Sequence, residues 1–221
     1  MDFTKVVNKR HSVRQFTDQA VETDLIKEIV TVAQRTPSWV NSQPWQVYCA
    51  QGTVLQQIKE AYREADQTGQ ASQPDLPVMS REEWAPRTQA NMKQWRHDIV
   101  HHFSNFDEAH TAMSTASDSL YNSPVILFIT VPQASPDWSI FDAGAFAQTL
   151  MLAATNRGLG SIPTYNSVRF PNILRQILGI PDTERVLVGI SLGYPADQPL
   201  NHYHSQPLPF ATSTVKQRTA F

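Results

Sequence analysis

The chain has 221 residues, 41% of them hydrophobic, which is enough for a substantial globular core. A net charge of -2 gives no field that would draw the protein to nucleic acid or to an anionic membrane, and the single cysteine, Cys49, excludes an internal disulfide. With no signal-peptide pattern and no apolar run long enough to span a bilayer, we expect a cytoplasmic protein without nucleic-acid or membrane partners.

In the first third of the chain, the pattern of apolar residues predicts two helices with one strand between them. Apolar residues recur at helical spacing from Glu22 to Gln34, with Thr23 as a candidate N-terminal cap. Alternation over Trp45–Ala50 predicts a strand, and Thr53–Asp66 is again typical of a helix. Prolines interrupt residues 67–87, which indicates a long loop.

The middle of the chain predicts the buried centre of the fold. Two polar helices are expected near Thr88–Phe103 and Asp107–Tyr121. The apolar run Val125–Val131 suits a central strand covered on both faces. Phe141–Asn156 is apolar almost all round, so we expect a helix buried on more than one side, with a subunit interface as one explanation.

The last third is expected to contain a turn at Gly158–Pro163, a short helix at Asn172–Leu178 and a strand at Val186–Leu192. A proline-rich arm, residues 194–221, shows no core of its own and would be loose or laid across another surface. We therefore predict one domain, residues 1–221, with an inserted loop and helical region at about 67–123.

A cluster of basic and hydroxyl side chains follows the first expected helix. Arg10 and Arg14 flank His11 and Ser12. One guanidinium can take a phosphate bidentately while the other reaches a second polar edge of the same ligand. Because cations also finish ordinary helices, a solvated basic helix end explains this cluster equally well.

A polar loop bounded by prolines, residues 37–45, joins the helix after residue 22 to the first strand. Its hydroxyl, amide and indole groups suit a loop that presents hydrogen-bond donors to a ligand. Asn, Ser and Pro are also ordinary turn residues, so a simple helix-to-strand connection remains the alternative.

These motifs, in this order, resemble the nitroreductase family. The pattern Arg10-x-Ser12-x-Arg14-x-Phe16 precedes Pro37-Ser38-x-x-Asn41-x-Gln43-Pro44-Trp45, and the segments 157–163, 178–181 and 189–195 follow the family's second half. Residues 67–123 contribute little to the likeness. The resemblance implies an α+β nitroreductase-like fold, with a central, mostly antiparallel sheet flanked by helices, in an intertwined homodimer with a C-terminal arm.

The resemblance also implies where FMN binds. The resemblance places four residues near the phosphate, ribityl chain and pyrimidine edge: Arg10, His11, Ser12 and Arg14. It places five residues against the flavin of the partner subunit: Pro37, Ser38, Trp39, Asn41 and Gln43. By the same resemblance, four further residues lie around flavin N5, namely Pro163, Thr164, Tyr165 and Asn166, and the backbone N–H of Tyr165 is the group nearest to N5.

The C-terminal phosphate contact departs from the family. Members often carry a basic residue there, whereas this chain reads Ser205-Gln206-Pro207-Leu208-Pro209. Pro207 has no side-chain donor, so Ser205 is the residue left to contact the phosphate. The resemblance does not say which cation replaces the missing one.

The implied activity is transfer of two electrons from NAD(P)H through FMN to a small aromatic acceptor, nitroaromatic or quinone-like, by a ping-pong mechanism. No side chain is assigned as an acid or base. Two alternatives stay open: dehalogenation or azoline oxidation on the same scaffold, and a flavin-binding protein without turnover.

A histidine-rich stretch is the rival candidate site. His97 and His101 share a helical face, with His102 and His110 nearby. No cysteine or close carboxylate pair completes a metal-binding set, so we favour a solvated helix face and expect no metal.

Overall fold

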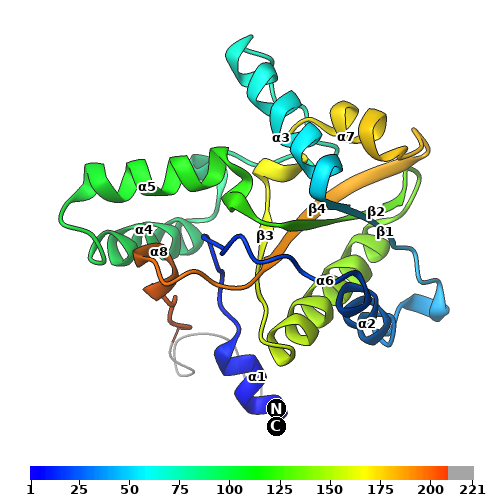
Figure 1. Cartoon of the computed structure of the whole chain (residues 1–221), viewed down its shortest axis with the longest axis horizontal. Helices are drawn as coiled ribbons and strands as arrows, with labels where there is room; N and C mark the ends of the chain where they lie inside the picture. Colours follow the sequence, from blue (N-terminus) through cyan, green and yellow to red (C-terminus); the bar gives the residue numbers. More distant parts are fainter. Residues whose placement is uncertain (209–221) are drawn as a thin grey trace, which may run out of the picture.

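A four-stranded antiparallel sheet organises residues 1–208, the part of the chain that this computed structural model describes (Figure 1). The strands are β1 (Gln46–Gln51), β2 (Val125–Pro132), β3 (Gly160–Thr164) and β4 (Glu184–Gly193), in the order β1-β2-β4-β3. Helices cover both faces of the sheet. The predicted α+β class with a mostly antiparallel sheet is confirmed.

Strand β2 lies at the centre of the core, as its unbroken apolar run predicts. Residues 125–131 are fully buried because helices pack on both faces. On one face lie α2 (Thr23–Ala33) and α6 (Asp137–Asn156), and on the other α3 (Gly52–Gln67) and α7 (Pro171–Leu178). Even α6 is not apolar enough to cross a membrane, nor is any other helix in residues 1–208.

The region predicted as an insertion forms a helical pair at one side of the molecule (Figure 1). It consists of α4 (Pro86–Val100) and α5 (Phe106–Asp118), and the short α8 (Pro199–His202) packs against it. Leu200 and Tyr203 are buried there, so the start of the C-terminal arm does have a core, contrary to our expectation. Residues 209–221 of the predicted arm lie outside the described residues. The N-terminal helix α1 (Phe3–Lys9) packs against α6.

Two other predictions about elements are wrong. Gly158–Pro163 is not simply a turn: Gly158 ends α6 with a φ of 83°, but β3 begins two residues later. Its glycine and proline obscured the strand, although an edge strand tolerates proline. Thr23 is the first residue of α2 and Glu22 is its N-cap, without a side-chain capping bond. The helix predicted at Phe141–Asn156 is confirmed as α6, which begins four residues earlier, at Asp137.

Candidate functional site

The arginine-containing segment after α1 lies along the free edge of β3. The backbone N–H of Val13 donates to the carbonyl of Ser161 at 3.1 Å, and Ser12 forms a parallel bridge with Ser161. Gly160 permits this approach, since a Cβ there would lie 2.6 Å from Val13 Cγ2. This contact is therefore an isolated β-bridge that holds the arginine segment against the edge of the sheet.

Arg14 is a buried cation at the end of this segment. Its side chain is 8% exposed, Nη1 donates to the carbonyl of Ser12 at 3.1 Å, and the guanidinium lies 5.6 Å from the Trp95 ring centroid. Burial lowers the pKa of the guanidinium, but arginine keeps its charge. Within residues 1–208 no carboxylate forms an ion pair with Arg14. An unpaired buried charge is unfavourable, so this position is suited to an anionic ligand.

Asn201 of α8 holds the backbone of this segment and was not foreseen from the sequence. Its side-chain carbonyl accepts from the N–H groups of Arg14 at 2.7 Å and Gln15 at 3.2 Å. Its amide donates to the carbonyls of Gln15 at 2.7 Å and Ala196 at 2.8 Å. These partners are far away in sequence or separated by a loop, so no local pattern could identify Asn201.

The turn after β3 presents the backbone of Tyr165 along the same strand edge. Alternate residues of a strand direct their main-chain groups to the same edge, here those of Ser161 and Pro163, and Tyr165 is the first residue after the end of β3. Pro163 has no N–H, and the Tyr165 N–H donates to no main-chain carbonyl among residues 1–208. The edge of β3 thus carries the arginine segment alongside it and, within residues 1–208, a Tyr165 N–H without a main-chain acceptor just beyond its end.

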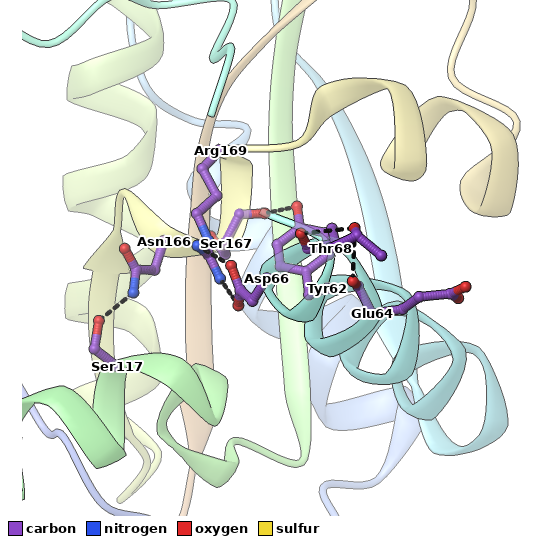
Figure 2. Close-up of polar contacts among 9 residues, drawn as sticks. Tyr62, Glu64, Asp66, Thr68, Ser117, Asn166, Ser167 and Arg169 are labelled. Atoms are coloured by element: carbon purple, nitrogen blue, oxygen red, sulfur yellow. Dashed lines mark hydrogen bonds and ion pairs between the residues drawn. The ribbon is translucent and has the colours of Figure 1, made fainter. Parts of the chain in front are cut away.

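Side chains from two other helices anchor this turn (Figure 2). The Tyr62 hydroxyl of α3 donates to the Ser167 carbonyl at 2.7 Å, and the Asn166 amide donates to the Ser117 hydroxyl of α5. Arg169 forms a two-pronged ion pair with Asp66 of α3. The turn is therefore fixed from both sides.

The predicted side chains around Tyr165 differ in orientation. Thr164 is buried and pairs with Gly189 of β4, and its hydroxyl donates to the Gly189 carbonyl at 3.2 Å, so its side chain is not accessible to a ligand. The Tyr165 side chain is 44% exposed, and Pro163 is exposed beside it. Tyr165 and Pro163 are thus the accessible members of the predicted set.

The polar loop, residues 37–43, has a defined and strained shape. The Trp39 N–H donates to the buried Asp142 of α6 at 3.0 Å, and the Gln43 N–H donates to the Ser38 hydroxyl at 2.8 Å. The Gln43 amide also donates to the Asn41 side-chain carbonyl at 2.9 Å. Val40, Asn41 and Gln43 have φ values of 45°, 58° and 42°. Such backbone conformations cost about 1 kcal/mol or more each and concentrate at functional sites.

The structure does not bring this loop to the arginine segment of the same chain. In Figure 1 the loop lies on the far side of α2 and α6 from the segment that follows α1. Pro37, Trp39, Asn41 and Gln43 are exposed, and Ser38 is half-buried. One chain therefore unites the predicted residues 10–14 and 163–166 but leaves residues 37–43 facing outward.

The C-terminal arm does reach the arginine segment. The ring of His204 stacks on that of His11 with centroids 3.8 Å apart. Ser205, the predicted phosphate contact, is exposed next to it. Of the rival histidines, His97 and His101 lie with ring centroids 4.4 Å apart, but residues 1–208 contain no group of three side chains placed to hold a metal ion.

The sequence profile of the nitroreductase family matches residues 7–194. The chain is 30% identical to 4-nitrobenzoate reductase from Pseudomonas putida, over 87% of this chain and 85% of that protein. It is also 30% identical to nitrobenzene nitroreductase from Ectopseudomonas oleovorans, over 86% and 85% of the two chains.

A solved structure shares the fold. It is the FMN-dependent nitroreductase NfnB from Mycobacterium smegmatis in complex with NADPH, with a TM-score of 0.87 and 23% identity, over 98% of this chain and all of that one. At this identity the likeness concerns the fold alone. The arrangement of helices around the sheet is thus that of a known architecture.

Proposed function

Because the chain belongs to the nitroreductase family, we propose that it is an FMN-dependent oxidoreductase that transfers two electrons from NAD(P)H to nitroaromatic or quinone-like acceptors by a ping-pong mechanism. Relatives named for the reduction of 4-nitrobenzoate and nitrobenzene support this substrate class. The observation that carries the proposal is Arg14, a buried cation for which residues 1–208 provide no carboxylate partner, beside the edge of β3, the strand that Tyr165 follows.

The groups along this edge suit FMN. Its phosphate and ribityl chain would lie near Arg10, His11 and Ser12, and its ring near Arg14 and Tyr165. When bound, FMN supplies the two-electron chemistry, because it accepts electrons from a nicotinamide and passes them to the second substrate. The protein then needs to supply binding, orientation and electrostatics.

The side chains of the site provide those three functions. Arg14 stabilises negative charge that develops on the ring, and it does so strongly because burial excludes water from the charge. The Tyr165 N–H is free to donate a hydrogen bond to the ring, and the exposed ring of Tyr165 offers a flat wall for an aromatic acceptor. No side chain needs to act as an acid or a base in this reaction.

We further propose that two chains form a homodimer in which residues 37–43 of each complete the site of the other. Large apolar side chains lie exposed where such a contact would form. Trp39 and Val40 of the loop are 61% and 78% exposed, and Trp138 and Phe141 of α6 are 62% and 67% exposed. Exposed apolar surface of this kind is typical of protein interfaces. It would become buried if the loop reached a partner's flavin.

An absorbance spectrum of the purified full chain, followed by cofactor extraction, tests the proposal. We expect the visible bands of a flavin and the release of FMN. Oxidation of NADPH and of NADH is then measured with 4-nitrobenzoate and with a simple quinone as acceptors. Parallel lines in double-reciprocal plots would support the ping-pong order.

The outcomes separate the alternatives. A colourless protein that FMN cannot reconstitute would refute flavin binding. A yellow protein that oxidises neither nicotinamide with any acceptor would be a flavin-binding protein without turnover. Turnover restricted to halogenated phenols or azolines would place the chain with the other chemistries of the scaffold.

A further inference from the structure

Two histidines, distant in sequence, form a stacked pair beside Arg10. His11 follows α1 and His204 follows α8, and their rings lie 3.8 Å apart at an angle of 23°. The His11 ring is half-buried, whereas His204 is exposed. The pair thus joins the C-terminal arm to the arginine segment at a position that solvent and ligands can reach.

The hydrogen bonding of His11 leaves one ring nitrogen for a ligand. Nδ1 lies 2.9 Å from the carbonyl of Lys9, and a carbonyl can only accept, so Nδ1 carries the hydrogen. Nε2 is then the nitrogen that gains a proton when the ring becomes charged. A protonated His11 would direct an Nε2–H donor away from its own backbone.

The charges around the pair are predominantly positive. His204, Arg10 and Arg14 all face His11, and the Lys9 carbonyl is the group that favours its protonation. Burial lowers the pKa of His11, and the electrostatic effects of His204, Arg10 and Arg14 lower it further. Among residues 1–208 no carboxylate forms an ion pair with His11, His204, Arg10 or Arg14. An anion is the missing partner of this cluster.

We propose that His11 and His204 together bind the phosphate group of FMN, with His204 taking the place of the basic residue that residues 205–209 lack. This inference rests on the proposed function. Two imidazolium rings in contact repel each other, whereas a phosphate dianion that accepts hydrogen bonds from both offsets the repulsion. The arm would thereby close over the phosphate end of the ligand.

Proton uptake should accompany FMN binding. The second pKa of a phosphate monoester is about 6, so the ligand is mostly a dianion at pH 7.5. Burial lowers the pKa of His11, so its ring is neutral at that pH in the free protein, and a bound dianion favours its charged form. Riboflavin has no phosphate and should bind without this uptake.

The experiment compares apoprotein of the full chain with His204→Gln, His204→Lys and the matched control His202→Gln. His202 lies in the same segment, but its ring pairs with Asp197 at 2.7 Å. FMN and riboflavin are titrated by flavin fluorescence at pH 7.5. We expect His204→Gln to weaken FMN binding roughly tenfold or more, with riboflavin unchanged, because a charge-assisted hydrogen bond is lost. His204→Lys should restore most of the affinity, and His202→Gln should bind both ligands like the wild type.

Calorimetry in two buffers of different ionisation enthalpy measures the proton uptake, which should be smaller in His204→Gln. Equal FMN affinity in wild type and His204→Gln would overturn the inference. So would an equal loss for FMN and riboflavin, or a change confined to the KM for NADPH. Failure of the wild type to bind either flavin would instead refute the proposed function.

Discussion

The Arg14 guanidinium lies 5.6 Å from the centroid of the Trp95 ring, so a helix of the inserted region covers the buried cation of the site. Trp95 also packs edge-on against Tyr203 of the C-terminal arm, with centroids 6.2 Å apart. The inserted region and the C-terminal arm, to which the sequence motifs assign no role, therefore form one wall around Arg14. Their packing excludes water from its charge and strengthens its interaction with any anion.

Replacing Arg14 with methionine should stabilise the apoprotein and weaken flavin binding at the same time. The side chain carries a buried charge that no carboxylate in the described part of the chain pairs with, so an apolar side chain of similar length should raise the free energy of unfolding by about 1 kcal/mol or more. FMN affinity should fall at least roughly tenfold. The reduction potential of bound FMN should become more negative, by about 30 mV for each 1.4 kcal/mol of lost stabilisation of the reduced form.

Chemical denaturation of the apoprotein, fluorescence titration and a redox titration measure these three effects. Arg96→Met is the matched control, because Arg96 is exposed on the same helix as Trp95. A destabilised Arg14→Met apoprotein with unchanged flavin affinity would mean that the cation serves the fold rather than a ligand.

Asn201→Ala should destabilise the protein and loosen the arginine segment. The variant leaves the N–H groups of Arg14 and Gln15 without the acceptor they share. A buried donor without a partner costs about 1–3 kcal/mol. We expect a loss of that size in urea unfolding and weaker FMN binding. His202→Ala, at the exposed neighbouring position, should change neither; an equal effect of both variants would contradict the role given to Asn201.

Tyr62→Phe removes the hydroxyl that anchors the turn after β3 while keeping the ring, which packs edge-on against Phe170. The Ser167 carbonyl then loses a partner in a buried site, and we expect a loss of about 1–2 kcal/mol in the free energy of unfolding. Because the turn carries Tyr165, kcat should fall more than FMN affinity. Tyr48→Phe, whose hydroxyl donates to Glu184 in a half-buried position, is the control. Wild-type stability and kcat in Tyr62→Phe would show that the turn does not depend on this hydrogen bond.

Periodicity in the sequence was sufficient for the elements that build the core. The helix α2 and the buried strand β2 follow directly from apolar spacing, since burial on one face or on two leaves a distinct pattern. Strand β3 was not predicted, because its Gly160 and Pro163 are residues typical of a turn. Tertiary structure explains both residues. Gly160 leaves room for the Val13 side chain, and Pro163 lies in an edge strand, where a missing N–H is tolerated.

The site shows the same division. Arg14 and Tyr165 belong to motifs that the family shares, so the resemblance identified them. Asn201 and Trp95 act through contacts with residues more than 80 positions away in sequence, and such contacts leave no local signal. The His11–His204 stack is likewise visible only once the arm is folded back onto the segment after α1.

The central claim is that residues 10–14 of one chain and residues 37–43 of another make one flavin site. Arg14→Met impairs the first part and Asn41→Gly the second; glycine is chosen because Asn41 has a φ of 58°. In a heterodimer of the two variants, one site receives both changes and the other receives neither, because a two-fold dimer exchanges identical loops.

The decisive measurement is the activity of that heterodimer, co-expressed with two different tags and purified through both. Each variant homodimer should be strongly impaired, and the heterodimer should regain about half of the wild-type turnover, since one of its two sites is intact. A heterodimer no more active than its parents would show that the site lies within a single chain and would contradict the account.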